Sequence, residues 1–140
     1  MPFKWFGKVS FVPYTRVTDF ADHLKDGKLM GSKCCECGQV TFPPRADCLG
    51  CMSPDFEWIE YSGDAVLNTF TIIHAAPTGF DDMVPYMLGI VDLPEGGRLL
   101  GWMGDVTEEE IEIGMKLKVV PRIFEEIAEI KVHYTLEKAE

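Results

Sequence analysis

The chain has 140 residues, of which 46% are hydrophobic, and this is enough to bury the core of one ordinary domain. No apolar run reaches the roughly 18 residues of a membrane span and no signal-peptide pattern is visible, so we expect a cytoplasmic protein without a membrane partner. The net charge of −10 is uneven, because residues 1–51 carry seven Lys/Arg against five Asp/Glu whereas residues 52–140 carry six against eighteen, and the acidic second part disfavours a nucleic-acid partner.

An aromatic segment followed by a short helix is predicted for residues 1–30. We expect its first aromatic side chains to pack on this chain or on a partner, since they are too many for a free tail: Trp5, Phe6, Phe11 and Tyr14. The sequence TDFADHLKDGK predicts a helix that Thr18 or Asp19 could cap and Gly27 could end. Phe20 and Leu24 would share its buried face, and a loop with one helical turn is the alternative.

All five cysteines lie in residues 31–54, within the sequence SKCCECGQVTFPPRADCLGC. Two C-x-x-C pairs separated by ten residues match the spacing with which four thiolates surround one Zn(II) ion at about 2.3 Å. Gly38 and Gly50 would supply the backbone freedom that the two turns need, with N–H groups facing the sulfurs. We therefore predict a metal site with four ligands: Cys34, Cys37, Cys48 and Cys51.

The predicted metal is structural, because four cysteines fill the coordination shell and a catalytic zinc usually keeps one position open for water. A rubredoxin-type iron centre has the same ligands, so iron is not excluded. No second redox centre or flavin motif accompanies the site, which favours a zinc ribbon whose folding depends on the metal. Cys35 follows directly on Cys34, so its side chain should point elsewhere, and we predict that it is not a ligand.

Residues 55–140 are predicted to form an all-β barrel of five or six strands. The sequence FEWIEYSGDAVLNTFTIIHAAP alternates and breaks at residues 63–64, and PYMLGIVDLPEGGRLLGWMGD predicts two strands joined by a hairpin at residues 94–97. A charged turn or short helix precedes a strand expected at residues 115–120. A last strand is expected near residues 127–136.

His74, in the sequence TIIHAAPTGFDD, is the candidate for acid–base chemistry through a pair with Asp81 or Asp82. No nucleophile motif, phosphate-binding loop or dinucleotide fingerprint accompanies it, so we prefer a strand-end histidine bonded to backbone. The acidic residues 108–112 are most simply a solvated turn. We therefore predict no catalytic residues in this chain.

The sequence GKLMGSKCCECGQVTFPPRADCLGC resembles the N-terminal rubredoxin-like zinc ribbon of the acyl-CoA-associated OB-fold family. The shared features are a short helix, then G-K-L, C-x-x-C-G, F-P-P-R and C-x-x-C. The segments GRLLGWMGD and EIEIGMKLKVV also resemble the OB-fold strands of that family. The resemblance implies a mainly β protein in which a short helix and a zinc ribbon precede a five- to six-stranded OB-fold barrel.

What the resemblance implies for function is a non-catalytic subunit of thiolase-superfamily enzymes, or of related hydratases and aldolases, that act on acyl-CoA. The ribbon-plus-barrel layout is most similar to small archaeal subunits that join acetoacetyl-CoA thiolase to hydroxymethylglutaryl-CoA synthase in mevalonate synthesis and share the CoA-bound intermediate. A hetero-oligomer follows from this reading. A nucleic-acid-binding OB-fold protein and an enzyme that uses His74 are the alternatives.

Coenzyme A is the ligand that the resemblance implies. Arg45, beside the ribbon, is the candidate for a CoA phosphate, although it could instead bond to carbonyl groups of the ribbon. Phe80 and Tyr86, in the apolar loop 75–87, and Trp102 could flank the pantetheine arm. The same aromatic residues would serve equally well in a protein interface.

Overall fold

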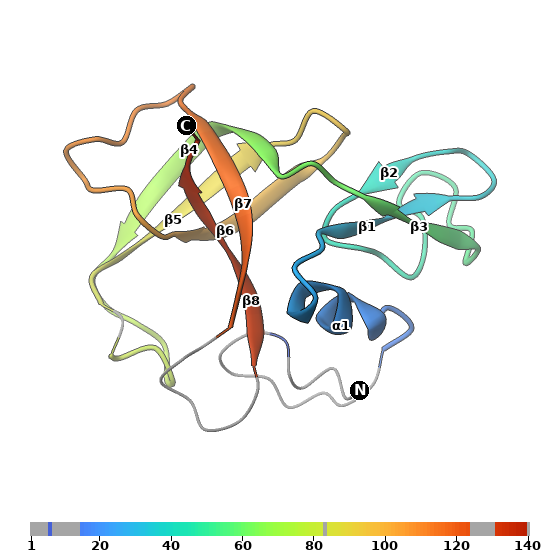
Figure 1. Cartoon of the computed structure of the whole chain (residues 1–140), viewed down its shortest axis with the longest axis horizontal. Coiled ribbons are helices and arrows are strands. Elements are labelled where there is room, and N and C mark those ends of the chain that lie inside the picture. The colour runs from blue at the N-terminus through green and yellow to red at the C-terminus, as the bar shows by residue number, and fades with distance from the viewer. Residues whose placement is uncertain (1–5, 7–14, 83, 124–130, 140) are drawn as a thin grey trace.

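The computed structural model describes residue 6 and residues 15–82, 84–123 and 131–139. In these residues one helix, a three-stranded sheet and a closed five-stranded barrel follow each other along the chain (Figure 1). The mainly β architecture with a cysteine module ahead of a barrel is therefore as predicted. The one helix in the described part of the chain is neither long nor apolar enough to cross a membrane.

Helix α1 (Asp19–Lys25) forms where the sequence predicts it and buries Phe20, Ala21 and Leu24. Thr18 is the N-cap residue, in one of the two predicted positions, but its side chain makes no capping bond and its hydroxyl donates to the Thr15 carbonyl instead. Just after the end of the helix, Gly27 adopts a φ of +80°, as expected for a glycine that ends a helix. The helix packs against both the ribbon sheet and the barrel.

Phe6 is the described member of the expected aromatic segment. It forms a bridge with Val132, and its ring lies 5.3 Å from that of Phe20. Packing of the segment on this chain is thus confirmed for Phe6. Three other members lie outside the described residues: Trp5, Phe11 and Tyr14.

The ribbon sheet is antiparallel with the order β2-β1-β3, where β1 is Met30–Cys34, β2 is Val40–Thr41 and β3 is Phe56–Glu60. Strand β3 lies in the segment from which the sequence predicts barrel strands, yet all five of its residues pair with β1. The chain then turns at Gly63, which has a φ of +91°, and enters the barrel. One continuous alternating segment therefore supplies a strand to each of the two sheets.

The barrel has the order β4-β5-β6-β8-β7, with β7 pairing back to β4 to close it. Its strands are β4 (Asp64–Ile73), β5 (Tyr86–Asp92), β6 (Arg98–Met103), β7 (Lys116–Ile123) and β8 (Val132–Lys138). The hairpin at residues 94–97 joins β5 to β6 as predicted, and residues 108–110 form a turn. The predicted last strand is found from Val132 onward, and residues 127–130 lie outside the described ones.

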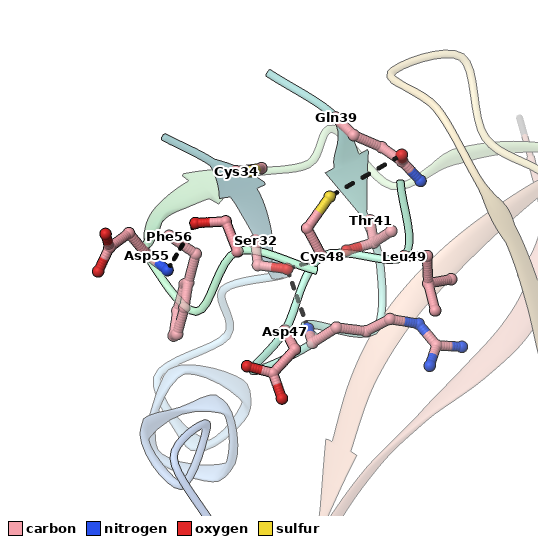
Figure 2. Close-up of a pocket in the computed structure, with 11 residues that line it drawn as sticks. Ser32, Cys34, Gln39, Thr41, Asp47, Cys48, Leu49, Asp55 and Phe56 are labelled. Carbon is pink, nitrogen blue, oxygen red and sulfur yellow. Dashed lines mark hydrogen bonds between the residues drawn. The ribbon is translucent and has the colours of Figure 1, made fainter. Parts of the chain in front are cut away.

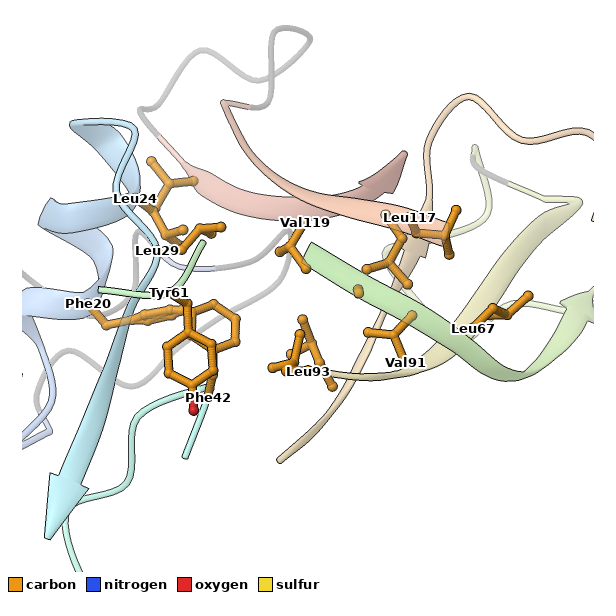
Figure 3. Packing of buried hydrophobic residues seen from close by; sticks show 14 of the residues in the cluster. Phe20, Leu24, Leu29, Phe42, Tyr61, Leu67, Val91, Leu93, Leu117 and Val119 are labelled. Atoms are coloured by element: carbon orange, nitrogen blue, oxygen red, sulfur yellow. The ribbon is translucent and has the colours of Figure 1, made fainter. Parts of the chain in front are cut away.

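One hydrophobic core runs from the barrel into the junction with the ribbon (Figure 3). Leu67, Val91 and Leu117 fill the barrel, and Phe42 and Tyr61 continue the core toward α1. Two polar contacts add to this junction. The Tyr61 hydroxyl donates to the Gly96 carbonyl at 2.8 Å, and the Ser62 N–H donates to the Glu95 carboxylate at 2.7 Å. The tip of the β5–β6 hairpin is thereby fixed beside the ribbon.

Candidate metal centre and ligand surfaces

The four predicted ligand sulfurs converge at one end of the ribbon. Their Sγ atoms all lie within 4.8 Å of one another. The pair Cys34–Cys51 is separated by 3.5 Å and the pair Cys37–Cys48 by 3.4 Å, far beyond the length of a disulfide bond of about 2.05 Å. Four sulfurs at 2.3 Å around a tetrahedral ion would lie about 3.8 Å apart, so the cluster fits a zinc or iron ion closely.

The two knuckles have matching backbone hydrogen bonds. In the first, the Gly38 N–H donates to the Cys34 carbonyl, and in the second the Met52 N–H donates to the Cys48 carbonyl. The Cys37 N–H points at the Cys34 sulfur at 3.5 Å, and the Gly50 N–H points at the Cys48 sulfur at 3.3 Å. These N–H groups favour thiolates, as the spacing predicted.

The glycines of the two knuckles do not have equivalent roles. Gly38 has a φ of +77°, as expected, but in the second knuckle it is Met52 that has a positive φ, of +63°. At Gly50 an added Cβ atom would meet the end of the flexible Gln39 side chain, which can move aside, so the structure does not require glycine there. Sequence reasoning missed Met52, because a non-glycine residue gives no signal of a left-handed conformation.

The electrostatics of the cluster favour a bound cation. The Cys37 N–H lowers the pKa of Cys34 to about 6. For Cys51 the Ser53 N–H acts in the same direction, but hydrogen bonding to Cys34 and to the other sulfurs prevails and raises its pKa to about 12. Four sulfurs this close cannot all lose their protons unless a cation replaces them.

Cys35 lies outside the cluster and is exposed. Partial desolvation, together with the carboxylates of Glu57 and Asp55, raises its pKa above the ordinary value. It therefore remains a neutral thiol under conditions in which the four clustered sulfurs can bind metal, as expected for a residue that is not a ligand.

Behind the knuckles, polar side chains hold the linker between the two cysteine pairs. The Ser32 hydroxyl accepts a hydrogen bond from the Arg45 N–H at 2.9 Å and lies 2.9 Å from the Thr41 hydroxyl (Figure 2). Ser32 is buried, so these two partners satisfy it. The Phe-Pro-Pro-Arg linker is thus attached to β1 through its backbone.

Arg45 itself is exposed, and in the described part of the chain its guanidinium has neither an ion pair nor a hydrogen bond. It lines a groove of about 540 Å³ between β2 and the tip of the β5–β6 hairpin. Arg98, which sequence reasoning missed, lines the same groove from the barrel. Only the folding of the hairpin tip onto the ribbon brings the two cations to one site.

The three aromatic candidates lie together at the other end of β6. The ring of Phe80 lies 5.8 Å from that of Trp102 and 6.5 Å from that of Tyr86. His133 stacks edge-on against Trp102 at 5.5 Å. Arg98 and Trp102 are four residues apart on one strand, so this aromatic cluster lies roughly 13 Å from the arginine groove. The structure thus separates Arg45 from the other three predicted CoA contacts.

His74 is exposed and lines a shallow pocket of about 340 Å³ together with Tyr86, Met103 and Glu108. No hydrogen bond in the described part of the chain joins it to Asp81 or Asp82. The proposed acid–base pair is thus not formed in this structure.

The sequence matches two family models, a ChsH2-type rubredoxin-like zinc ribbon domain at residues 21–57 and a ChsH2-type C-terminal OB-fold domain at residues 58–122. Proteins named DUF35 domain-containing scaffold protein are similar to it in Methanocaldococcus jannaschii (37% identity, 74% of this chain, 75% of the relative) and Pyrococcus furiosus (39%, 81% and 84%). A Thauera aromatica protein named benzoylsuccinyl-CoA thiolase subunit BbsA is 32% identical over 58% of this chain and 57% of its own length.

Among solved structures, one described as the Ltp2-ChsH2(DUF35) aldolase matches with a TM-score of 0.73 and 25% identity, over 91% of this chain and 98% of the other. The match covers ribbon and barrel together. The arrangement of the two parts is therefore shared with that chain.

Proposed function

This chain belongs to the family of DUF35 scaffold proteins, which join a ChsH2-type zinc ribbon to an OB-fold, and we propose that it is a non-catalytic scaffold subunit of an acyl-CoA-processing enzyme complex. The observation that carries the proposal is the match of both parts, in one chain, to proteins named as scaffolds. The closed four-thiol centre supports it, since such a centre stabilises a fold rather than reacting with substrate.

In its finer form, we propose that the chain bridges acetoacetyl-CoA thiolase and hydroxymethylglutaryl-CoA synthase in mevalonate synthesis and helps to pass the CoA-bound intermediate between them. The two archaeal scaffold relatives support this form. A partner of another acyl-CoA enzyme is the second candidate, favoured by the thiolase-subunit name of one relative and by the aldolase complex among the structural matches.

The CoA molecule is proposed to lie at the boundary between this chain and its partner. Arg45 lines the open groove of about 540 Å³, and its guanidinium is suited to a phosphate group, whereas the charge of Arg98 in the same groove is already compensated by Asp92. Phe80, Tyr86 and Trp102 offer an aromatic surface suited to the pantetheine arm. The metal is proposed to be zinc, which elemental analysis of the purified protein would identify as one ion per chain.

A coupled assay with purified acetoacetyl-CoA thiolase and hydroxymethylglutaryl-CoA synthase tests the bridging role. Adding this chain should form a complex of all three proteins on size exclusion and lower the acetoacetyl-CoA found free in solution at steady state. The chain alone should have neither activity. Free acetoacetyl-CoA at an unchanged level, with three separate elution peaks, would refute the bridge, and the same experiment with a hydratase or an aldolase then tests the second candidate.

A further inference from the structure

Strands β4, β5 and β6 have an apolar surface on the outside of the barrel as well as on the inside. Strand β5, with the sequence YMLGIVD, is apolar at nearly every position rather than at every second one. Its residues Gly89 and Val91 are buried and point into the barrel, so Leu88 and Ile90 point outward. A strand with two apolar faces is typical of a sheet that is covered on both sides.

The strand registers extend this surface across three strands. Ile90 pairs with Thr69 and Leu100, and Leu88 pairs with Thr71 and Trp102. Paired residues point to the same side of a sheet, so these side chains form two adjacent rows. We call the side chains of these two rows, together with the neighbouring Val66, the β4–β6 outer face: Val66, Thr69, Thr71, Leu88, Ile90, Leu100 and Trp102.

Several of these side chains are open to solvent. Leu100 is 56% exposed and Val66 is 43% exposed, and Thr69 and Thr71 are exposed as well. The inward neighbours Val91 and Leu99, by contrast, belong to the hydrophobic core. The outer face is therefore apolar and uncharged without contributing to the core of the fold.

A row of paired polar groups borders the face on the side of the hairpin. Asp92 accepts hydrogen bonds from the Arg98 guanidinium at 2.6 Å and from the Asn68 amide at 3.1 Å. The aromatic cluster around Phe80 borders it at the opposite end. Because the charges of Asp92 and Arg98 compensate each other, nothing in the two rows opposes close approach of another apolar surface.

The face has the size of the centre of an interface and not of a whole one. Three strands about 4.8 Å apart and two rows about 6.7 Å apart give an area of roughly 200 Å². A stable interface covers about 800 Å² on each partner, so neighbouring loops would contribute the rim.

We propose that the β4–β6 outer face docks an enzyme subunit of the acyl-CoA complex, one whose contact surface is apolar at the centre and basic at the rim. The inference rests on the proposed function for the kind of partner. A second copy of this chain fits less well, because residues 52–140 carry six Lys/Arg against eighteen Asp/Glu and two such barrels would repel each other. The same acidic charge is complementary to a basic rim.

Docking at this face would also explain where the aromatic cluster lies. Trp102 belongs both to the face and to the cluster, so a docked enzyme would place the cluster at the edge of its interface. A CoA arm shared by the two proteins would pass along that edge.

Isothermal titration of the whole chain with purified acetoacetyl-CoA thiolase, and separately with hydroxymethylglutaryl-CoA synthase, tests the inference. Leu100→Glu should weaken binding to one of them by at least tenfold, because it places a charge at the centre of an apolar contact. The matched control is Ile113→Glu, since Ile113 is 63% exposed and lies outside the face. It should bind like the unchanged chain. Melting temperature and metal content should be the same in all three proteins.

The possible results separate the inference from the proposed function. If both enzymes bind the unchanged chain and the Leu100→Glu chain equally, the face is not the docking site, while the scaffold role stands. If neither enzyme binds, the bridging function fails and the inference falls with it. Sedimentation of the chain alone adds a further check: a dimer that Leu100→Glu converts to monomer would show that a second copy occupies the face.

Discussion

The ribbon and the barrel are stabilised by different means. From β1 to β3 few apolar side chains are buried, and Phe42, the largest of them, points into the junction rather than into the ribbon. The barrel instead buries a closed set of aliphatic residues that includes Leu67, Leu99 and Leu136. A segment as short as the ribbon cannot form a sufficient core of its own, so we propose that a bound metal takes the place of the core.

This difference assigns separate roles to the two parts. The four thiols that look reactive in the sequence form a closed cluster, which we propose to be a structural metal centre. The barrel strands, which look like ordinary core strands, have the apolar outer face that remains available for a partner. The predictions below test how independent the two sources of stability are, beginning with the largest expected effect.

Replacing one metal ligand should unfold the ribbon and spare the barrel. In Cys48→Ser the metal site loses a thiolate, and the binding energy of a structural zinc, roughly 10–16 kcal/mol, is no longer available to fold the ribbon. Hydrogen exchange should show that the amides of β1 and β3 lose protection while those of β5 and β6 keep it. Cys35→Ser is the matched control and should leave the metal and the exchange pattern unchanged. Loss of protection across both parts would show that the barrel depends on the metal as well.

Truncating a core residue of the barrel should destabilise the barrel and leave the metal site intact. Leu67 is 1% exposed, and Leu67→Ala should lower the free energy of unfolding by about 2–5 kcal/mol, through lost burial and the cavity left behind. Urea unfolding measures the change, and elemental analysis should still find one metal ion per chain. Metal loss in this variant at low urea would contradict the independence of the two parts.

The two knuckles should respond in opposite directions to changes at their left-handed residues. Gly38→Ala should destabilise the ribbon by about 1–2 kcal/mol, because a Cβ atom is unfavourable at a φ of +77° although no atom lies within 4 Å of it. Met52→Gly should relieve the corresponding strain and tighten metal retention slightly. Competition with a chromophoric chelator measures both variants. Equal effects with the same sign would mean that backbone strain does not govern the knuckles.

The smallest expected effect is the loss of barrel stability at low pH. Arg98 and Asn68 hold the pKa of Asp92 below its ordinary value of 3.8. A lowered folded-state pKa means that this contribution is fully present above pH 3.8 and is lost as the pH falls through the folded-state value. The free energy of unfolding of the barrel should therefore fall slightly in that pH range, and it should fall less in the Asp92→Asn variant than in the unchanged chain. The ribbon should be lost at a higher pH, since metal binding requires deprotonated sulfurs. Along a pH series, urea midpoints measure the stability of the barrel and metal release measures the loss of the ribbon.

The convergence of the four cysteine sulfurs and the strand pattern were predictable, because each depends on local spacing. Two C-x-x-C pairs define a four-sulfur site, and alternation with Gly63 and residues 94–97 as breaks defines the strands. The pairing of β3 with the ribbon was not predictable, since alternation does not reveal the partner strand. It was equally unpredictable that Arg45 and Arg98 line one groove, because this depends on the Tyr61 and Ser62 hydrogen bonds that hold the hairpin tip.

The outer face had a signal in the sequence that was open to more than one interpretation. The run YMLGIVD lacks the polar positions of a strand with one wet face, but an apolar run alone does not say whether another layer of the same chain covers it. Leu100, which pairs with Ile90 of that run, is 56% exposed, which indicates that no described layer of the chain covers this part of the sheet.

Native mass spectrometry of the metal-loaded chain, mixed at micromolar concentration with acetoacetyl-CoA thiolase and hydroxymethylglutaryl-CoA synthase, tests the scaffold role most directly. The account predicts one assembly that contains all three proteins and disappears when this chain is omitted. Two enzymes that assemble equally well without the chain, or a chain that stays alone in the presence of both, would contradict it.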